Sequence, residues 1–540
     1  MIFQGRFSMK SAVVFCGALG ALALLSGSNA RAFQAGGSAA HWEVVGAPGV
    51  SAGPVMCCQI ESDPRGVVHV AYQDDALGNN PASVRRFANG AWQYVGPQGS
   101  ASLMQAWYNH IAFDGRATPH VVNRDYGVGG RINVRRFDVA SGQWTNLGVP
   151  GPSAGEAHYT DIAIAPDGTT YVAYADRSTT PSDRATVLRY AQGSWSVVGA
   201  PGFSDGNAEY VSIAVAPDGT PFVAFGDRTR VDGSNTARVS VMQYDTAQDQ
   251  WIYVGSPGFS PTGGTNARIA FDRTGAPCVV YQQYHIALRV LRYNGDVWQP
   301  IGGSATGYDR PCVETESWRQ WLSLAFDSQN APYVAYQRFD DLNKATVRKF
   351  DGTAWVAVGA PGFSPPNADY MAMTVDAFDV PWVIFRNSTL GGRATVMRFA
   401  PSPYSYCTAS TDAIGCSPRI VASSGTAQGA SITTLSASGV VPGRLGRLLY
   451  SSRPGRMPFS GGTLCVASPF LSMGNQNSGG DDSGSGCTGA LSVDFAAFVR
   501  SGIDPALEPG TVVFAQFWYR DPYNAAGAGL TDALRFEIGL

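Results

Sequence analysis

Three residues have the types and spacing needed for acid–base chemistry on a carbohydrate. His110 and Tyr108 are two positions apart, which on a β-strand predicts side chains on the same face. They could remove and return a proton, while the guanidinium of Arg268 holds the carboxylate of an acidic sugar. His158, beside Tyr159, is a second candidate. Since a lone histidine is commonly a hydrogen-bonded structural residue, this set alone does not define an active site.

These residues belong to a repeated segment. The motif W-x-x-[VIL]-G, in which x is any residue, occurs seven times, and successive copies start 47 to 57 residues apart. Its tryptophans are Trp42, Trp92, Trp144, Trp195, Trp251, Trp298 and Trp355. Self-similarity at such a period is typical of propellers and other repeat folds.

Each copy contains short runs rich in Val, Ile, Tyr and Phe, separated by turn residues. One copy reads "YVSIAVA", "PFVAFG", "ARVSVMQYD" and "WIYVG", which predicts the four antiparallel strands of one blade. We therefore expect an all-β chain in which residues 33–400 form a seven-bladed β-propeller. No tryptophan strand follows Phe399, so the N-terminal strand "HWEVVG" is predicted to pair with "ATVMRF" and close the last blade.

The repeats resemble those of β-propeller families in general, without the Gly-His and Trp-Asp pairs of WD repeats or the double glycine of kelch repeats. "APDGT" is similar to part of the sialidase Asp-box, although the Ser and Trp of that motif are missing. The group of Tyr108, His110 and Arg268 resembles catalytic groups of polysaccharide lyases and sialidases built on propellers. That resemblance implies a polysaccharide-processing enzyme, but the three arginines and Glu–Tyr pair of sialidases are not found.

Aligning the copies predicts a functional face around the central channel, where loops lead into the innermost strands. The residues that begin these strands are Cys57, Tyr108, Tyr159, Tyr210, Asn266, Trp321 and Tyr370. Two positions on come Gln59, His110, Asp161, Ser212, Arg268, Ser323 and Ala372, which vary as a binding site would. The predicted ligand-binding residues are Tyr108, His110, Tyr159, Tyr210, Arg268, Trp321 and Tyr370. The alternative is that the aromatic rings only pack between blades.

A third aligned set follows the second strand of each copy and returns to the same face. Its members are Asp74, Asp125, Asp176, Asp227, Gln283, Arg338 and Asn387. Carboxylates beside tyrosines suit sugar hydroxyls or a hard cation such as calcium, whereas the structural alternative is turn capping. Asp481 and Asp482 could also contact calcium but lie in a polar segment typical of a solvated loop. No other cofactor and no metal centre is expected.

The N-terminus predicts export. Arg6 and Lys10 precede the apolar run "SAVVFCGALGALALL" and the cleavage pattern "ARA", so residues 1–32 are predicted to be a signal peptide. The run is too short for a membrane span. A net charge of -3 without basic clusters argues against nucleic-acid binding. We expect a secreted, periplasmic or extracellular protein.

Export makes disulfides the default interpretation of the remaining cysteines. The nearest pairings predict Cys407 with Cys416 and Cys465 with Cys487, each closing a loop rich in turn residues. Cys278 with Cys312 is a looser pairing. The adjacent Cys57 and Cys58 could form a strained ring or remain separate.

After a linker at residues 401–406, residues 407–540 are predicted to form a small β-sandwich. "YCTAS", "GCSP", "PFSGGTLCV", "AQFWYRDP" and "LTDALRF" resemble a C-terminal module of large exported bacterial proteins. Its most distinctive residues here are Gln516, Trp518, Tyr519, Arg520 and Asp521. The resemblance supports export and implies no chemistry.

The sequence thus favours a secreted, non-enzymatic binding or scaffold protein that recognises an extracellular glycan or protein on the channel face. Two alternatives remain open. One is a polysaccharide-processing enzyme, a lyase or sialidase-like glycosidase, with its site in the channel. The other is a structural component of an extracellular layer.

Overall fold

A computed structural model describes residues 41–538. Its gaps are residues 89–90, 230–235, 262, 284–286, 303–320, 339–340, 401–402, 408, 411–414, 425–431, 460–461, 481–485 and 509–510. The predicted signal peptide, Cys312, Asp481 and Asp482 therefore lie outside the described residues. Within the described ranges, no helix is both long enough and apolar enough to cross a membrane.

The chain is all-β, and its described residues up to 400 form seven four-stranded antiparallel sheets. The first sheet consists of β2 (Val55–Ser62), β3 (Val68–Asp74), β4 (Ala82–Ala88) and β5 (Ala91–Tyr94), and the second consists of β6 (Ala106–Phe113), β7 (Pro119–Asp125), β8 (Arg131–Asp138) and β9 (Gln143–Asn146). The third consists of β10 (Ala157–Ile164), β11 (Thr170–Asp176), β12 (Arg184–Ala191) and β13 (Ser194–Val197), and the fourth consists of β14 (Ala208–Val215), β15 (Pro221–Asp227), β16 (Arg238–Asp245) and β17 (Gln250–Tyr253). The fifth sheet consists of β18 (Gly264–Phe271), β19 (Pro277–Gln283), β20 (Ala287–Tyr293) and β21 (Trp298–Pro300), and the sixth consists of β22 (Ser323–Phe326), β23 (Pro332–Arg338), β24 (Lys344–Phe350) and β25 (Trp355–Ala357). The seventh consists of β26 (Ala368–Val375), β27 (Pro381–Asn387) and β28 (Arg393–Ala400), together with β1 (His41–Val44).

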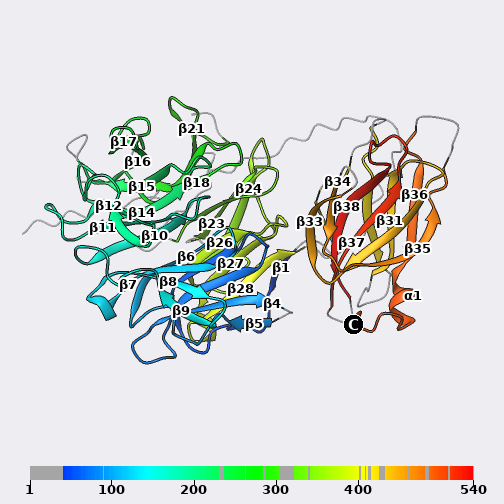
Figure 1. Ribbon diagram of the computed structural model, residues 1–540, viewed down its shortest axis with the longest axis horizontal. Coiled ribbons are helices and arrows are strands. Elements are labelled where there is room, and N and C mark those ends of the chain that lie inside the picture. Colours follow the sequence, from blue (N-terminus) through cyan, green and yellow to red (C-terminus); the bar gives the residue numbers. More distant parts are fainter. Residues whose placement is uncertain are drawn as a thin grey trace, which may run out of the picture. The chain divides into compact units, whose positions relative to one another are not determined.

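The sheets have a propeller-like arrangement. The first strand of each sheet contacts the first strand of the next, from β2 through β6, β10, β14, β18 and β22 to β26, and β26 contacts β2. Figure 1 shows sheets of neighbouring colour side by side, from blue through green to yellow. Valine, alanine and aromatic side chains from facing sheets form the buried clusters between them.

The repeated tryptophan motif joins neighbouring sheets by hydrogen bonds. Each indole Nε1 donates, over 2.6 to 3.0 Å, to the backbone carbonyl of the residue three positions after the preceding tryptophan. Trp92 thus donates to Val45, and Trp42 donates to Val358, which follows the last tryptophan, Trp355. The motif recurs because each copy supplies one donor and one acceptor.

A steric requirement explains why the motif ends in glycine. Gly46 has φ +75°, and a Cβ atom there would meet Cδ1 of the Trp92 indole at 2.9 Å. A side chain at this position would displace the ring that carries the hydrogen bond, so only glycine permits the close approach.

β1 pairs with the end of the repeat region, as the sequence predicts. It runs antiparallel to β28, with Trp42 opposite Phe399 and Val44 opposite Met397. The amide of Val45 adds a 2.9 Å hydrogen bond to the carbonyl of Val396. The seventh sheet therefore takes its outer strand from the start of the chain.

The C-terminal part contains three sheets and one short helix. One sheet has five strands in the order β29 (Tyr404–Tyr406), β38 (Ala528–Glu537), β37 (Val512–Arg520), β32 (Leu445–Ser451) and β35 (Leu471–Asn477). A second sheet has three strands in the order β30 (Arg419–Ser424), β31 (Ile432–Val440) and β36 (Gly489–Asp494). The third sheet pairs β33 (Pro454–Phe459) with β34 (Gly462–Val466), and the helix α1 spans Phe495–Arg500. The five-stranded and three-stranded sheets share a core that includes Leu435, Leu491, Phe517 and Phe536. Residues 404–406, expected in the linker, are a strand of the larger sheet.

The four C-terminal cysteines form two disulfides, but the predicted pairing is wrong. Cys407 bonds with Cys465, and Cys416 bonds with Cys487. Sheet order is the physical reason: Cys416 and Cys487 precede β30 and β36, which are the two neighbours of β31. Proximity along the sequence was therefore a poor guide to proximity in the fold.

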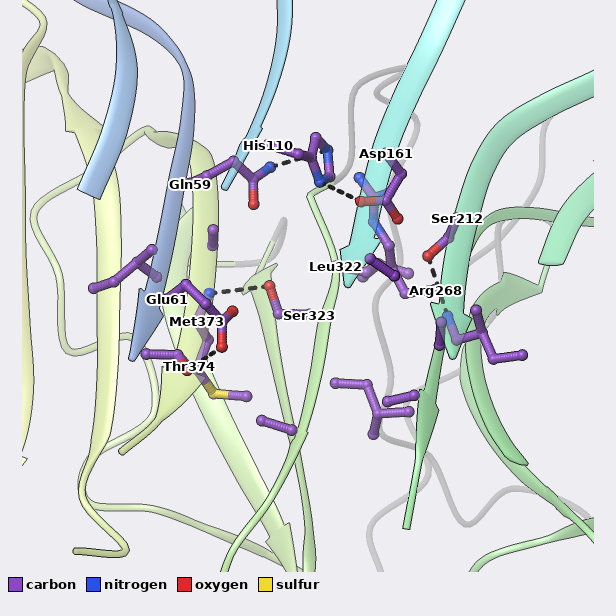
Figure 2. Close-up of a pocket in the computed structure, with 18 of the residues that line it drawn as sticks. Gln59, Glu61, His110, Asp161, Ser212, Arg268, Leu322, Ser323, Met373 and Thr374 are labelled. Carbon is purple, nitrogen blue, oxygen red and sulfur yellow. Dashed lines mark hydrogen bonds and ion pairs between the residues drawn. The ribbon is translucent and has the colours of Figure 1, made fainter. Parts of the chain in front are cut away.

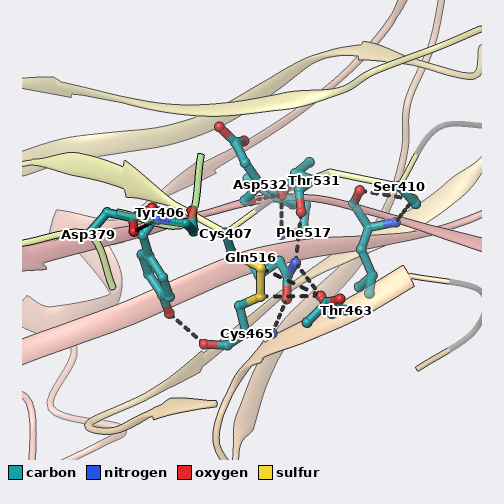
Figure 3. The surroundings of a disulfide bond; sticks show 12 residues. Asp379, Tyr406, Cys407, Ser410, Thr463, Cys465, Gln516, Phe517, Thr531 and Asp532 are labelled. Carbon is teal, nitrogen blue, oxygen red and sulfur yellow. Dashed lines mark hydrogen bonds between the residues drawn. A yellow bond between two sulfur atoms is a disulfide. The ribbon is translucent and has the colours of Figure 1, made fainter. Parts of the chain in front are cut away.

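Gln516 holds the surroundings of the other disulfide together (Figure 3). Its buried side-chain oxygen accepts from the amide of Cys465 at 2.9 Å. Its nitrogen donates to the carbonyls of Thr463 at 3.1 Å and Thr531 at 2.7 Å. One residue of the distinctive C-terminal motif thus bridges β34, β37 and β38.

Three cysteines of the repeat region are buried free thiols. Cys57 and Cys58 are not bonded to one another, which excludes the strained ring in this structure. Cys278 is also a free thiol, and its suggested partner Cys312 lies outside the described residues.

Candidate functional site

A β-bulge recurs at the same place in six of the described first strands. In β6 the pairing passes from Trp107 opposite Arg124 to His110 opposite Val122, so one extra residue is inserted. The bulged residues have φ between 50° and 54°; they are Cys57, Tyr108, Tyr159, Tyr210, Asn266 and Tyr370. Positive φ is uncommon outside glycine and is recurrent at functional sites. The first set of aligned residues therefore marks a repeated backbone irregularity.

Beyond the bulge, the second aligned set lines a single cavity of ≈ 560 Å³ (Figure 2). All seven members contribute: Gln59, His110, Asp161, Ser212, Arg268, Ser323 and Ala372. The expectation that Tyr108 and His110 share a face does not hold here, because the extra residue changes the alternation and only His110 lines the cavity.

The predicted aromatic residues form two groups. The rings of Tyr108 and Tyr159 have centroids 5.4 Å apart, and those of Tyr159 and Tyr210 are 4.7 Å apart. These three half-buried rings form a row, called the tyrosine row below. Trp321 and Tyr370 form a separate pair at 4.7 Å. Of the seven predicted ligand residues, only His110, Arg268 and Trp321 line the cavity.

His110 is held on both sides of its ring. Nδ1 lies 2.8 Å from Oδ1 of Asp161, and Nε2 lies 3.4 Å from the side-chain nitrogen of Gln59. The other oxygen of Asp161 accepts from the backbone amide of Ile213 at 3.0 Å. Burial alone would raise the pKa of Asp161, but His110, Arg268 and the Ile213 amide hold it below its ordinary value. The ionised Asp161 carboxylate therefore fixes the orientation of the His110 ring.

Arg268 supplies a positive charge in the cavity. Burial lowers the pKa of its guanidinium, while the negative charge of Asp161 opposes that effect. Throughout the described part of the chain, no ion pair or hydrogen bond joins this guanidinium to another side chain. A guanidinium can bind a planar anion such as a carboxylate by donating hydrogen bonds to it.

His158 and the third aligned set have structural partners. His158 Nδ1 lies 3.4 Å from Asp183, and burial lowers the pKa of the imidazole. Asp125 is fully buried and accepts from the amides of Leu103, Met104 and Gly127. Asp74, Asp176 and Asp227 likewise accept from amides of their own turns. Among the described residues, no group of three or more His, Cys, Asp or Glu is placed to hold a metal ion.

Sequence reasoning missed Glu61 and Thr374, which also line the cavity. The Thr374 hydroxyl donates to Oε1 of Glu61 over 3.4 Å. Burial raises the pKa of Glu61 to about 7, whereas the Thr374 hydroxyl and the Ser62 amide act in the opposite direction. A signal was available: the equivalent residue is alanine in all five other copies, namely Ala112, Ala163, Ala214, Ala270 and Ala325.

Glu61 predicts a pH-dependent stability. Its pKa is about 7 in the folded chain, against an ordinary value of 4.5. Between these values the unfolded chain ionises first, so the free energy of unfolding falls as the pH rises through this window. The loss reaches about 3 kcal/mol above the window. We expect Glu61→Gln to remove this pH-dependent loss of stability. In urea unfolding, the difference in unfolding free energy between the variant and the wild type should therefore grow as the pH rises through the window and stay constant above it.

Thr374→Val keeps the carboxyl and serves as the control, because it should retain the pH dependence. A Glu61→Gln difference that is equal below and above the window would show that the carboxyl titrates as a solvated group.

Comparisons with known proteins identify no family for this chain. No family model matches the chain, and no curated protein matches it. Among solved structures, a protein of unknown function from Dyadobacter fermentans is 10% identical, with 67% of this chain and 98% of that chain covered and a TM-score of 0.38. A polysaccharide lyase described as an ulvan lyase is 13% identical, with 66% and 94% covered and a TM-score of 0.42. A lectin of Aleuria aurantia is 14% identical, with 58% and 97% covered and a TM-score of 0.37.

Proposed function

We propose that this chain is a secreted, non-enzymatic binding protein that recognises a glycan at the channel of a seven-bladed propeller. One observation carries the proposal: seven equivalent side chains, different in almost every copy, line one cavity of ≈ 560 Å³. A volume of this size suits a small ligand, and convergent polar groups in a concave site fix its orientation.

The polar groups of the cavity suit a hydroxylated ligand. Gln59 and Ser212 offer an amide and a hydroxyl, Asp161 offers a carboxylate, and Arg268 offers a guanidinium. Aromatic rings stack on the C–H faces of sugars, and the tyrosine row lies at the strand ends that lead into this cavity. In the described part of the chain, the Tyr108 and Tyr159 hydroxyls have no hydrogen-bond partner.

The tyrosine row can be tested without disturbing the bulge. Asn266 occupies the same bulge position with φ 54°, so Tyr159→Asn removes the ring and keeps a residue that tolerates this backbone. We expect Tyr159→Asn to weaken binding to a glycan selected on an array by about tenfold, because stacking is lost. Isothermal titration gives the affinity, and the melting temperature should change little.

Tyr523→Asn removes an exposed tyrosine of the C-terminal part and should leave glycan affinity unchanged. Glycan binding that survives Tyr159→Asn at full strength would exclude the tyrosine row from the site. If no glycan on a broad array retains the wild-type protein, the proposed function is wrong.

The pairing of His110 with Asp161 favours one second candidate, a polysaccharide-processing enzyme. An imidazole oriented by a carboxylate beside Arg268 is a suitable acid–base group for an acidic polysaccharide. Incubation with uronate-containing polysaccharides and analysis of the product ends separates the two functions. Chain cleavage that His110→Gln abolishes would establish the enzyme, and intact polymer retained on the protein would establish binding.

The proposal includes the architecture around this site. Seven sheets linked by tryptophan hydrogen bonds, with β26 contacting β2, support a closed seven-bladed ring. Two sheets sharing one core support a C-terminal β-sandwich, and its two disulfides are consistent with an extracellular protein. The predicted signal peptide supports export.

A further inference from the structure

Glu61 and Thr374 occupy one level of the channel, two residues beyond Gln59 and Ala372. At the same level, Ala163, Ala214, Ala270 and Ala325 line the cavity with methyl groups. Glu61 comes from β2 and Thr374 from β26, so the pair is assembled where the first and last sheets meet. At this level the cavity wall is thus made of alanine methyl groups, with polar side chains only at Glu61 and Thr374.

The Glu61 carboxyl is partly buried and has few hydrogen-bond partners. Thr374 donates one long hydrogen bond of 3.4 Å, and Figure 2 shows the two side chains directed toward one another. A carboxylate can accept about four hydrogen bonds. Within the ranges that the structure describes, no lysine, arginine or histidine forms an ion pair with Glu61. Acceptor positions therefore remain open to the cavity.

Fold stability does not explain this carboxyl. Alanine at the equivalent position suffices in five other sheets. Burying a carboxyl without a cation destabilises the folded chain, as its pKa of about 7 indicates. A destabilising polar group that faces a cavity is a functional-site candidate.

We propose that Glu61 and Thr374 form a separate subsite that holds two hydroxyl groups of a sugar ring. The carboxyl accepts from one hydroxyl, the Thr374 hydroxyl bonds the other, and the alanine methyls contact the C–H face of the ring. Arg268 in the same cavity selects a sugar that also carries a carboxylate, which makes a uronate the complementary ligand class. This inference rests on the proposed glycan-binding function.

The test uses the full chain and D-glucuronate as the probe, followed by saturation-transfer NMR and isothermal titration. Glu61→Ala introduces the residue that five other sheets carry, and Thr374→Val removes only the hydroxyl. We expect each variant to bind glucuronate about tenfold more weakly, because one hydrogen bond to a charged or buried group is lost. Arg189→Gln, on the exposed surface of β12, is the matched control and should bind as the wild type does.

The outcomes separate the subsite from the proposed function. If Tyr159→Asn weakens binding and Glu61→Ala does not, the subsite is wrong and glycan recognition stands. If the wild type binds neither glucuronate nor any arrayed glycan, both are wrong. Preferential, Glu61-dependent binding of D-glucosamine, whose ammonium would pair with the carboxylate, would replace the hydroxyl subsite by a cation site.

Discussion

Replacing Trp42 by alanine is expected to destabilise the repeat region by about 4 kcal/mol, the range for removing a buried tryptophan. Trp42 is 8% exposed, its ring stacks on Phe363 with centroids 3.9 Å apart, and its Nε1 donates to Val358 over 2.7 Å. These contacts join β1 to the sheet that precedes the seventh. Urea unfolding should give the loss, and limited proteolysis should show earlier cleavage at the β1 segment.

Two further variants separate the causes. Trp42→Phe keeps an aromatic ring against Phe363 and loses the hydrogen bond, so a smaller loss of about 1 kcal/mol is expected. Trp195→Ala removes the equivalent, less buried ring within the chain and should leave β1 resistant to protease. Unchanged stability of Trp42→Ala would mean that these contacts of β1 do not stabilise the repeat region in solution.

The second large effect concerns the disulfide between Cys416 and Cys487. It links residues 71 apart in the sequence, and the chain-entropy model assigns such a loop about 4 kcal/mol. We expect the double variant Cys416→Ala, Cys487→Ala to lower the free energy of unfolding of the C-terminal part by that amount. The remaining sensitivity to a reductant should then come from Cys407 and Cys465.

Peptide mapping without reduction provides the control for connectivity. It should recover peptides that join Cys416 to Cys487 and Cys407 to Cys465. Peptides that join Cys407 to Cys416 would instead support the pairing of nearest neighbours in the sequence.

Much of the repeat architecture was predictable because one motif carries its own contacts. The tryptophan, the residue three positions later and the following glycine form the link between sheets, so their recurrence predicts seven four-stranded units. The pairing of β1 with β28 was predictable from the missing strand after Phe399. The aligned set from Gln59 to Ala372 also converges on one cavity, as alignment of the copies indicated.

The remaining errors have local causes. Alternation along a strand predicted Tyr108 beside His110, but a bulge with positive φ at a tyrosine cannot be read from residue types that favour regular strands. Glu61 was not predicted because its position is alanine in most copies, and a position with little variation resembles a structural one. The predicted disulfide connectivity was wrong because the pairing depends on the order of strands in a sheet, which the spacing of cysteines in the sequence does not specify.

The pairing of β1 with β28 also sets the order in which the chain can fold during synthesis. Glu43 on β1 forms an ion pair with Arg398 on β28, 355 residues later. Strand β1 must therefore remain without this neighbour until residue 400 has been made. Contacts between such distant residues slow folding, and an unpaired strand is prone to pair with other chains. Nascent molecules of this protein should thus depend on factors that shield their N-terminal edge until the last repeat is complete.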